Sequence, residues 1–319
     1  YRGEIMEAGP VETIFRRPAH PYLKGLMAAV PHFDMKPGER LKALREIPVN
    51  ADTLIGKRKQ ERQGPEILLS VRNVIKTYGT RKSSWFGKNT AAGVRAVDDV
   101  SFDVRRGECL GIVGESGCGK STLSKIVMRA VTPDSGSVKA IDVLSAQGDD
   151  LKTLRTKIQM VFQDPVSSLS PRMTVQNILS EPLEIHDRGS AQERKEKVLR
   201  LVQAIGLDQS ALNRYPHSFS GGQRQRIGIA RALALGPDLM ICDEPVSALD
   251  VSVQAQILNL LKDLQKELGL TYFFISHNLA VVDYMADRIA VMCGGRIVEL
   301  APRETLMRSP VHPYTKALL

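Results

Sequence analysis

The sequence contains little cysteine and no long uninterrupted apolar run. Cysteine occurs four times in 319 residues, at Cys109, Cys118, Cys242 and Cys293, and no two are close together. This spacing argues against a disulfide framework or a cysteine metal site, and predicts free thiols in a reducing compartment. No stretch reaches the roughly 18 consecutive apolar residues that a membrane-spanning helix needs. The sequence therefore excludes a disulfide mini-protein and contains no obvious transmembrane segment.

The composition is that of a folded globular protein. Hydrophobic residues make up 43% and charged residues 25%, which suits one large domain or two small ones. The net charge of +9 is compatible with a solvated basic surface, a nucleic acid, an anionic membrane face or phosphate ligands. Charge alone does not choose among these four.

The two ends of the chain repeat each other. Residues 3–27 and 295–319 align without gaps at an offset of 292, and 13 of the 25 positions are identical, including His20/His312 and Tyr22/Tyr314. Only the ends match, which excludes a short-period solenoid. Because the chain also begins with Tyr1 rather than Met, we expect a piece of a longer tandem protein, holding the tail of one module and most of a second.

The repeat suggests a division of the chain into four parts. Residues 1–50 are interpreted as the tail of the preceding module, 51–66 as a linker, 67–293 as the main domain and 294–319 as an extension containing His-Pro-Tyr. The whole join at 28–66 carries four prolines and the charged run KRKQER at 57–62. We expect it to be exposed and mobile, apart from a short helix at 38–46.

The main domain alternates buried strands with helices. Apolar runs at 109–114, 157–163, 238–243, 271–276 and 288–293 are typical of buried strands, and 252–268 has one apolar helical face. This alternation predicts an α/β fold with a mainly parallel sheet. The strands at 67–71 and 100–104 are spaced like a hairpin and predict an antiparallel β subdomain at one edge.

The segment GESGCGKST, residues 114–122, follows an apolar strand and precedes a helical run. It fits the phosphate-loop pattern, in which glycines let successive N–H groups face an anion at a helix N-terminus. Lys120 is expected to reach the β- and γ-phosphates of a nucleotide, and Ser121 to ligate Mg²⁺. The full candidate set is Gly114, Glu115, Ser116, Gly117, Cys118, Gly119, Lys120, Ser121 and Thr122.

A second segment, LMICDEP at 239–245, delivers two carboxylates to the end of a strand. Ligands bind at the carboxyl ends of strands in open α/β sheets. With a phosphate loop upstream, Asp243 is expected to hold Mg²⁺, and Glu244 to orient and polarise the attacking water.

A third segment, FSGGQRQR at 219–226, places Ser220, Gly221, Gly222 and Gln223 at the start of a helical run. It forms either an ordinary serine-capped helix or a second anion-binding helix N-terminus. A second anion site in one chain implies a second subunit. The sequence SGGQ at 220–223, called the signature below, is similar to that of ATP-binding cassette (ABC) transporters, and over residues 67–319 the chain resembles their nucleotide-binding subunits.

The resemblance assigns further roles. It implies a P-loop NTPase core with antiparallel β and α-helical subdomains, and ATP and Mg²⁺ as cofactors. Gln163 matches the glutamine that senses Mg²⁺ and the membrane partner, and His277 the switch histidine that contacts the γ-phosphate. Tyr78 is the candidate for stacking on adenine, with 79–93 as an inserted hairpin loop. The loop that meets the opposite subunit corresponds to Ser247, Ala248, Leu249 and Asp250.

The resemblance also implies partners. In this family ATP lies between the phosphate loop of one cassette and the signature of another, so we expect a second ABC ATPase domain, either from a homodimer or from the fused first module. Phe162, Pro165 and residues 166–175 are candidates for contact with transmembrane permease subunits. The alternatives are core packing for Phe162 and an ordinary loop for the rest.

The sequences RYPHSFSGGQRQR and VFQDPVSSLSPR and the His-Pro-Tyr tail at 312–314 resemble the ATPases of oligopeptide, dipeptide and glutathione importers. This implies an extracytoplasmic peptide-binding protein in the complex and a peripheral location on the cytoplasmic face of the inner membrane. Two alternatives are a soluble ABC ATPase acting on nucleic acid or the ribosome, and an exporter cassette. This chain lacks the long insertions that are usual in soluble ABC ATPases of that kind, and no nucleic-acid partner is expected.

Overall fold

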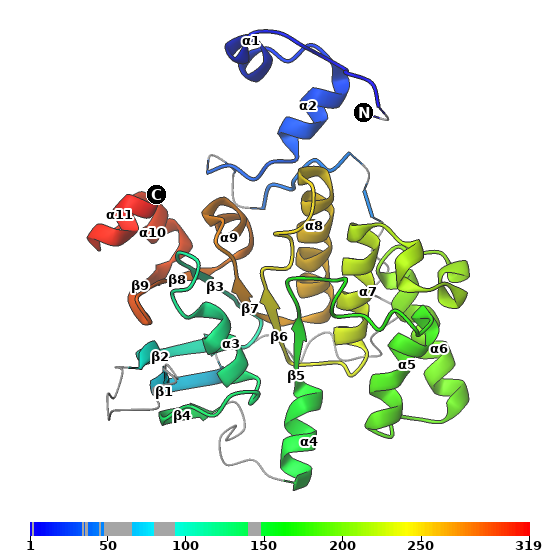
Figure 1. Cartoon of the computed structure of the whole chain (residues 1–319), viewed down its shortest axis with the longest axis vertical. Helices are drawn as coiled ribbons and strands as arrows, with labels where there is room; N and C mark the ends of the chain where they lie inside the picture. Colours follow the sequence, from blue (N-terminus) through cyan, green and yellow to red (C-terminus); the bar gives the residue numbers. More distant parts are fainter. Residues whose placement is uncertain are drawn as a thin grey trace, which may run out of the picture.

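The computed structural model describes residues 1, 3–33, 35, 38–44, 46–47, 66–79, 93–139 and 148–319. These residues form two β-sheets with helices packed around them (Figure 1). In this part of the chain, no helix has both the length and the apolar character needed to cross a membrane. All four cysteines are unpaired.

The larger sheet has six strands in the order β5-β6-β7-β3-β8-β9. The first five are parallel, and β9 pairs antiparallel with β8 at the edge. Every residue of β3, β6 and β7 is buried, which explains their uninterrupted apolar sequences, because helices cover both faces of a parallel sheet. The carboxyl ends of β3, β5, β6 and β7 therefore meet at one edge. The strands are β3 Cys109–Val113, β5 Ile158–Val161, β6 Leu239–Asp243, β7 Thr271–Ile275, β8 Arg288–Cys293 and β9 Arg296–Pro302.

The smaller sheet is antiparallel, with the order β2-β1-β4. Its strands are β1 Ile67–Tyr78, β2 Val94–Arg105 and β4 Ser135–Lys139. The antiparallel subdomain predicted from 67–71 and 100–104 is confirmed, and both strands extend well beyond those runs.

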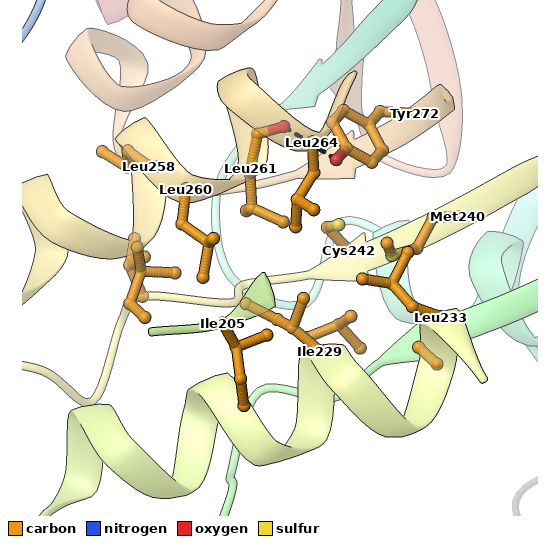
Figure 2. Packing of buried hydrophobic residues seen from close by; sticks show 14 of the residues in the cluster. Ile205, Ile229, Leu233, Met240, Cys242, Leu258, Leu260, Leu261, Leu264 and Tyr272 are labelled. Carbon is orange, nitrogen blue, oxygen red and sulfur yellow. Dashed lines mark hydrogen bonds between the residues drawn. The ribbon is translucent and has the colours of Figure 1, made fainter. Parts of the chain in front are cut away.

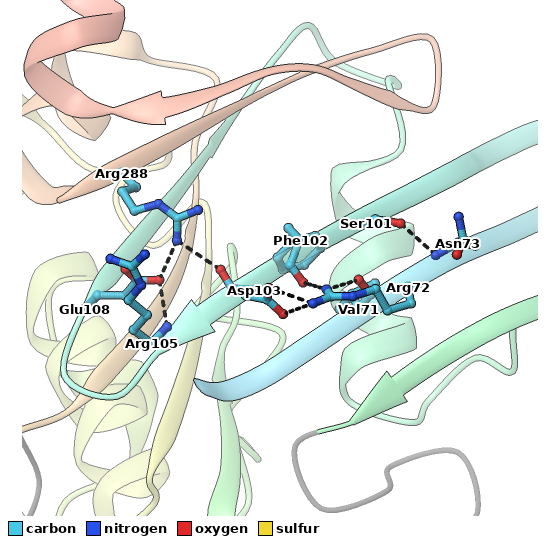
Figure 3. Close-up of polar contacts among 9 residues, drawn as sticks. All are labelled: Val71, Arg72, Asn73, Ser101, Phe102, Asp103, Arg105, Glu108 and Arg288. Carbon is cyan, nitrogen blue, oxygen red and sulfur yellow. Dashed lines mark hydrogen bonds and ion pairs between the residues drawn. The ribbon is translucent and has the colours of Figure 1, made fainter. Parts of the chain in front are cut away.

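Polar contacts tie this small sheet to the large one (Figure 3). Arg72 of β1 donates to the carbonyl of Phe102 at 3.1 Å and to the carboxylate of Asp103 at 2.7 Å. From β8, Arg288 donates to the carbonyl of Asp103 at 3.2 Å and to Glu108 at 3.1 Å. Burial raises the pKa of Glu108 even though Arg288 favours its charged form. Strand β2 thus contacts β1 within the small sheet and β8 of the large sheet.

The helices cover the large sheet and form a unit beside it. In the packed core, Ile229 of α7 and Leu261 and Leu264 of α8 lie against Met240 and Tyr272 of the sheet (Figure 2). The hydroxyl of Tyr272 donates to the carbonyl of Leu261 at 2.8 Å, so the buried ring leaves no unpaired O–H. Helices α5 and α6 pack on each other and on α7 (Figure 1). The helices are α3 Lys120–Val127, α4 Gly148–Lys157, α5 Val175–Ile185, α6 Ala191–Ala204, α7 Gly221–Leu233, α8 Val251–Leu268 and α9 Leu279–Met285, with 3-10 helices η3 Gln209–Asn213 and η4 Pro216–Ser218.

The repeated ends fold alike. Helices α1 Val11–Arg16 and α2 Pro21–Ala28 correspond, at the offset of 292, to α10 Arg303–Arg308 and α11 Pro313–Leu318, with α11 matching the first part of α2. In both copies a histidine Nδ1 accepts a hydrogen bond of 3.1 Å from the backbone N–H of the tyrosine two residues later. The sequence repeat is therefore a repeat of local structure.

Part of the segment after α2 is packed against the domain, so our expectation of an exposed join was wrong for the buried residues Ala29, Pro31, Leu41 and Ile47, although most of its other described residues are exposed. Leu41 is only 1% exposed, and its carbonyl accepts a 2.8 Å hydrogen bond from the buried amide of Asn259 on α8. One turn further along α8, Asp263 pairs with both terminal nitrogens of Arg40, at 2.7 and 2.8 Å.

The short helix predicted at 38–46 was also wrong, because the described residues of that stretch have no helical backbone. The Leu41 carbonyl accepts the N–H of Ala43 at 3.0 Å and the amide of Asn259, and a buried amide needs such a partner. The predicted linker at 51–66 lies outside the described residues except for Glu66.

Candidate functional site

The loop 114–122 connects the end of β3 to the start of α3. Gly114 and Gly119 have φ values of 154° and 109°, a region that side chains other than glycine rarely adopt. A Cβ at Gly119 would also collide with the carbonyl of Ala96 on β2, and one at Gly114 with the carbonyl of Met292 on β8. The glycines are therefore required both for the turn and for the close approach of neighbouring backbone.

Lys120 is the buried cation of this loop. The residue is 5% exposed, and its Nζ donates to the carbonyls of Gly114 at 2.7 Å and Glu115 at 2.8 Å. No carboxylate of the described residues lies within ion-pair distance of this ammonium. A buried charge without a counter-ion is costly, so this arrangement suits an anionic ligand.

Asp243 ends β6 beside the start of α3. Its two carboxylate oxygens accept hydrogen bonds from Ser121 Oγ at 3.4 Å and Ser124 Oγ at 3.3 Å. Burial raises the pKa of Asp243, and the hydrogen bond from Ser121 acts in the opposite direction. Ser124 was not predicted from the sequence, although its position one turn after Ser121 was the available signal.

Glu244 follows Asp243 in a left-handed backbone conformation, with φ 47°. Its N–H donates to the carbonyl of Ile275 at the end of β7 at 2.9 Å, which holds this conformation in place. One carboxylate oxygen, Oε2, lies 3.1 Å from Gln163 Nε2 and 3.0 Å from His277 Nδ1. Three loops far apart in the sequence thus converge on a single oxygen atom.

Lys120, Ser121, Gln163, Glu244 and His277 line one hollow of about 490 Å³, a size typical of small-molecule sites, whereas Asp243 and Ser124 do not line it. Gly114, Glu115 and Cys118 form the body of the loop without lining the hollow. The lining residues are Ala96, Ser116, Gly117, Gly119, Lys120, Ser121, Thr122, Gln163, Glu244 and His277.

Tyr78 does not line this hollow. It ends β1, is 43% exposed, and pairs with Val94 of β2. Ala96, two residues beyond Val94, does line the hollow, so Tyr78 lies on the neighbouring part of the same strand pair. The hairpin loop predicted at 79–93 falls mostly outside the described residues. The stacking role of Tyr78 stays a prediction.

The signature segment caps α7 and also lies outside the hollow. The Ser220 hydroxyl accepts from the N–H of Gln223 at 3.3 Å, and the Gln223 side chain accepts from the N–H of Ser220 at 3.0 Å. This reciprocal capping box fixes the start of the helix. A Cβ on Gly222 would collide with the side chain of Val253 on α8, which explains the glycine.

The loop 247–250 lies next to the signature. Asp250 caps α8 by accepting from the N–H of Val253 at 3.1 Å, and the Leu249 carbonyl accepts from Gln254 at 2.9 Å. A Cβ on Gly221 would lie 3.4 Å from Leu249. Ser247 and Ala248 are exposed. None of these four loop residues or the four signature residues lines the hollow at 114–122.

The proposed membrane-side contacts differ in exposure. Phe162 is 46% exposed and Val166 is 58% exposed, whereas Pro165 is buried. Asp164 orders the turn by accepting from the N–H of Val166 at 2.8 Å, and this bond lowers the pKa of Asp164. Core packing is therefore excluded for Phe162.

One contact of the site was not predicted from the sequence. The hydroxyl of Tyr314 accepts a 3.1 Å hydrogen bond from the backbone N–H of Glu115 in the loop. The repeated His-Pro-Tyr sequence singled out Tyr314, but no local pattern connects it to a residue 199 positions away.

Two protein-family models match this chain. The family model described as ABC transporter matches residues 97–247. The model described as the C-terminal region of oligopeptide/dipeptide transporters matches residues 6–59 and 298–319. The match at both ends corresponds to the internal repeat.

Among curated relatives, a probable peptide ABC transporter ATP-binding protein, y4tS of Sinorhizobium fredii, is 53% identical over 80% of this chain and 72% of its own length. The oligopeptide transport ATP-binding protein AppF of Bacillus subtilis is 51% identical, over 80% of this chain and 78% of its own. The glutathione import ATP-binding protein GsiA of Salmonella typhi is 45% identical over the whole chain. This chain spans about half of GsiA, 52% of its length.

Solved structures with the same fold include the ABC cassette MJ0796, described as dimeric in a post-hydrolysis state bound to ADP and Pi. It is 32% identical with a TM-score of 0.63, over 74% of this chain and 98% of its own. The cassette cbiO1 of Clostridium perfringens is 26% identical with a TM-score of 0.64, over 76% of this chain and 92% of its own. Nothing among these relatives favours the nucleic-acid or ribosome alternative. The chain belongs to the ABC transporter family, as one of its ATP-binding, ATP-hydrolysing subunits.

Proposed function

We propose that this chain binds MgATP on the loop 114–122, hydrolyses it against the signature of a second cassette, and so energises the import of peptides. The observation that carries the chemistry is the convergence of Lys120, Glu244 and His277 on one hollow. The cargo class rests on the peptide-transporter region matched at both ends of the chain.

Phosphate binding is assigned to the loop and to Lys120. Its ammonium is held at the loop by two backbone carbonyls and has no carboxylate partner among the described residues. The N-terminus of α3 adds its positive dipole end, which favours the β- and γ-phosphates. Electrostatic stabilisation of this kind is a main source of catalysis in phosphoryl transfer.

The residues beside the loop fit a magnesium ion. Asp243 is 7% exposed, and the contacts to its oxygens from Ser121 and Ser124 are long, at 3.3–3.4 Å. Burial disfavours its negative charge, which a hard divalent cation would offset. Ser121, Asp243 and Gln163 would hold the ion. When bound, Mg²⁺ would neutralise phosphate charge in the transition state.

Glu244 is proposed to orient and polarise the attacking water. Gln163 donates to Glu244 Oε2 at 3.1 Å, and His277 Nδ1 lies 3.0 Å from the same oxygen, so both side chains hold the carboxylate at the edge of the hollow. The carboxylate can then accept a proton from water as the oxygen attacks the γ-phosphate. His277 is assigned a contact with the γ-phosphate from the same position.

The signature is proposed to complete the site of a second cassette. Ser220, Gly221, Gly222 and Gln223 lie outside the hollow and form the capped N-terminus of α7, which presents N–H groups and a positive dipole end. The loop 247–250 packs beside them and would meet the same partner. ATP would then lie in the interface, and its hydrolysis would release the two cassettes from each other.

The partners and location follow from the family. We assign to the complex transmembrane permease subunits, contacted through exposed Phe162 and the turn after it, and an extracytoplasmic peptide-binding protein. The chain would lie peripherally on the cytoplasmic face of the inner membrane. Peptide and glutathione import by the named relatives supports oligopeptides, dipeptides or glutathione as cargo.

The parent protein is proposed to carry two fused cassettes. Residues 1–50 would be the tail of the first, 51–66 the join, 67–293 the second cassette and 294–319 its own tail. The equivalent folds of α1–α2 and α10–α11 support this division. So does the length of GsiA, of which this chain spans 52%.

Uptake in the source organism tests this function. The native gene is replaced by a Lys120→Ala version, and a Glu12→Gln version at an exposed site of α1 serves as the control. Uptake of labelled dipeptide, oligopeptide and glutathione is then measured, with a free amino acid as reference. We expect Lys120→Ala to lose uptake of at least one peptide class and to retain amino acid uptake. Unchanged uptake of all three would refute peptide import.

A further inference from the structure

The His-Pro-Tyr tail touches the phosphate loop through a single hydroxyl. Tyr314 Oη accepts the N–H of Glu115 at 3.1 Å. This N–H belongs to the peptide unit between Gly114 and Glu115. The carbonyl oxygen of the same unit, on Gly114, accepts from Lys120 Nζ at 2.7 Å. One peptide plane is thus held at both ends, by Tyr314 at the nitrogen and by Lys120 at the oxygen.

That plane needs an external contact to keep its orientation. Gly114 has no Cβ and a φ of 154°, so its own backbone preferences restrict the plane little. The Glu115 side of the loop is exposed, and without an acceptor from the protein its N–H would turn toward water. Rotation of the plane would then carry the Gly114 carbonyl away from the Lys120 ammonium.

Hydrogen bonds within the tail order the turn that carries Tyr314. The Glu299 carboxylate on β9 accepts the N–H groups of Val311 at 2.9 Å and His312 at 3.0 Å. His312 Nδ1 accepts the N–H of Tyr314 at 3.1 Å, and Pro313 begins α11. Burial raises the pKa of Tyr314, so the group stays a neutral hydroxyl at physiological pH.

The N-terminal copy separates the local fold from the contact. Glu7 accepts the N–H groups of Ala19 and His20, and His20 Nδ1 accepts the N–H of Tyr22, as in the C-terminal copy. The Tyr22 ring, however, lies 4.8 Å from the ring of Tyr1 and not at this phosphate loop. The turn is therefore a property of the repeated sequence, and the contact with the loop is specific to Tyr314.

We propose that Tyr314 is a positioning residue for Lys120: its hydroxyl fixes the 114–115 peptide plane, so that the Gly114 carbonyl keeps the ammonium where the phosphates of ATP bind. The inference rests on the proposed ATP-binding function and adds a role for the His-Pro-Tyr tail within it. The tail then acts as a support for the nucleotide site of its own cassette.

The first test is Tyr314→Phe in the full 319-residue chain, with Tyr22→Phe as the matched control. Phenylalanine keeps the ring and removes only the hydroxyl, whose oxygen accepts this hydrogen bond. We expect the KM for ATP to rise about two- to tenfold, the range for loss of one neutral hydrogen bond, while kcat stays within about twofold. Tyr22→Phe leaves both constants unchanged. An unchanged KM in Tyr314→Phe, or a fall in kcat alone, would overturn the proposal.

A double-mutant cycle with Lys120→Ala, read by calorimetric titration with ATP, separates positioning from tail packing. Positioning through Lys120 requires that Tyr314→Phe weaken ATP binding in the native background and have no further effect in Lys120→Ala. An equal loss in both backgrounds would mean that Tyr314 acts without Lys120, against the proposal. Failure of the unaltered chain to bind ATP would instead refute the proposed function itself.

Discussion

Replacement of Glu244 by glutamine separates ATP binding from hydrolysis. Glutamine has the same shape and keeps an oxygen that can accept the hydrogen bond from Gln163 and lie beside His277, the two neighbours of Glu244 Oε2. It loses the negative charge and the ability to take a proton from water. General-base catalysis contributes about 10²–10⁴ in rate. We therefore expect the turnover number to fall by that factor, which corresponds to about 3–5 kcal/mol in activation free energy.

The affinity of Glu244→Gln for ATP is expected to change by less than about threefold, because the phosphate contacts belong to the loop and to Lys120. Phosphate release at saturating MgATP measures turnover, and calorimetric titration measures affinity. Glu12→Gln makes the same chemical change at an exposed site on α1, where the side chain is 82% exposed, and should leave both unchanged. A variant that retains more than a tenth of the native turnover would refute the role of Glu244.

The same variant reports on assembly. If binding is retained without hydrolysis, ATP stays in the interface between a phosphate loop and a signature. Light scattering should then show monomers without nucleotide and dimers with MgATP. A monomer that still binds ATP would contradict self-pairing, and the sibling cassette would become the required partner.

Three further predictions concern binding, stability and pH. Lys120→Ala should weaken ATP binding at least tenfold, since a hydrogen bond to a charged group contributes about 1.5–3 kcal/mol, and titration with ATP measures it; unchanged affinity would contradict the phosphate role. Leu41→Ala should lower the free energy of unfolding by about 2–5 kcal/mol in denaturant melts, and Leu44→Ala, at a 38% exposed site, by much less; equal costs would mean that the segment is not docked. Asp243→Asn should stabilise the apoprotein at pH 7. Burial raises the folded-state pKa of Asp243 above its ordinary value, so the native carboxylate costs stability above that pKa and the cost disappears as the pH falls through it. The gain in melting temperature should therefore shrink on acidification, and a gain that grows would contradict the burial argument.

Much of the fold could be predicted because its determinants are local. The apolar runs of β3, β6 and β7 contain only buried residues, and such runs indicate strands covered on both faces. The phosphate loop could be located because the positive φ angles at Gly114 and Gly119 require glycine at fixed spacing. The roles predicted for Gln163 and His277 came from family resemblance, since no local pattern shows that both reach one oxygen of Glu244.

The errors arose where long-range contacts decided the structure. Residues 38–47 have the prolines and charges of a linker nearby, yet the Leu41 side chain is buried in the hydrophobic core and its carbonyl accepts the amide of Asn259 on α8. Tyr78 ends its strand as expected, and its stacking role stays a prediction.

The strands and helices of the main domain, the α/β class, the phosphate loop and the repeated turn could be predicted because each depends on neighbouring residues. The meeting of Glu244, Gln163 and His277, the contacts of Arg40 and Leu41 with α8, and the reach of Tyr314 but not Tyr22 to Glu115 come from the tertiary fold. Two copies of one turn have the same internal hydrogen bonds, so the difference between them lies in what the chain places opposite each. That placement depends on packing between distant segments, which a local pattern cannot specify.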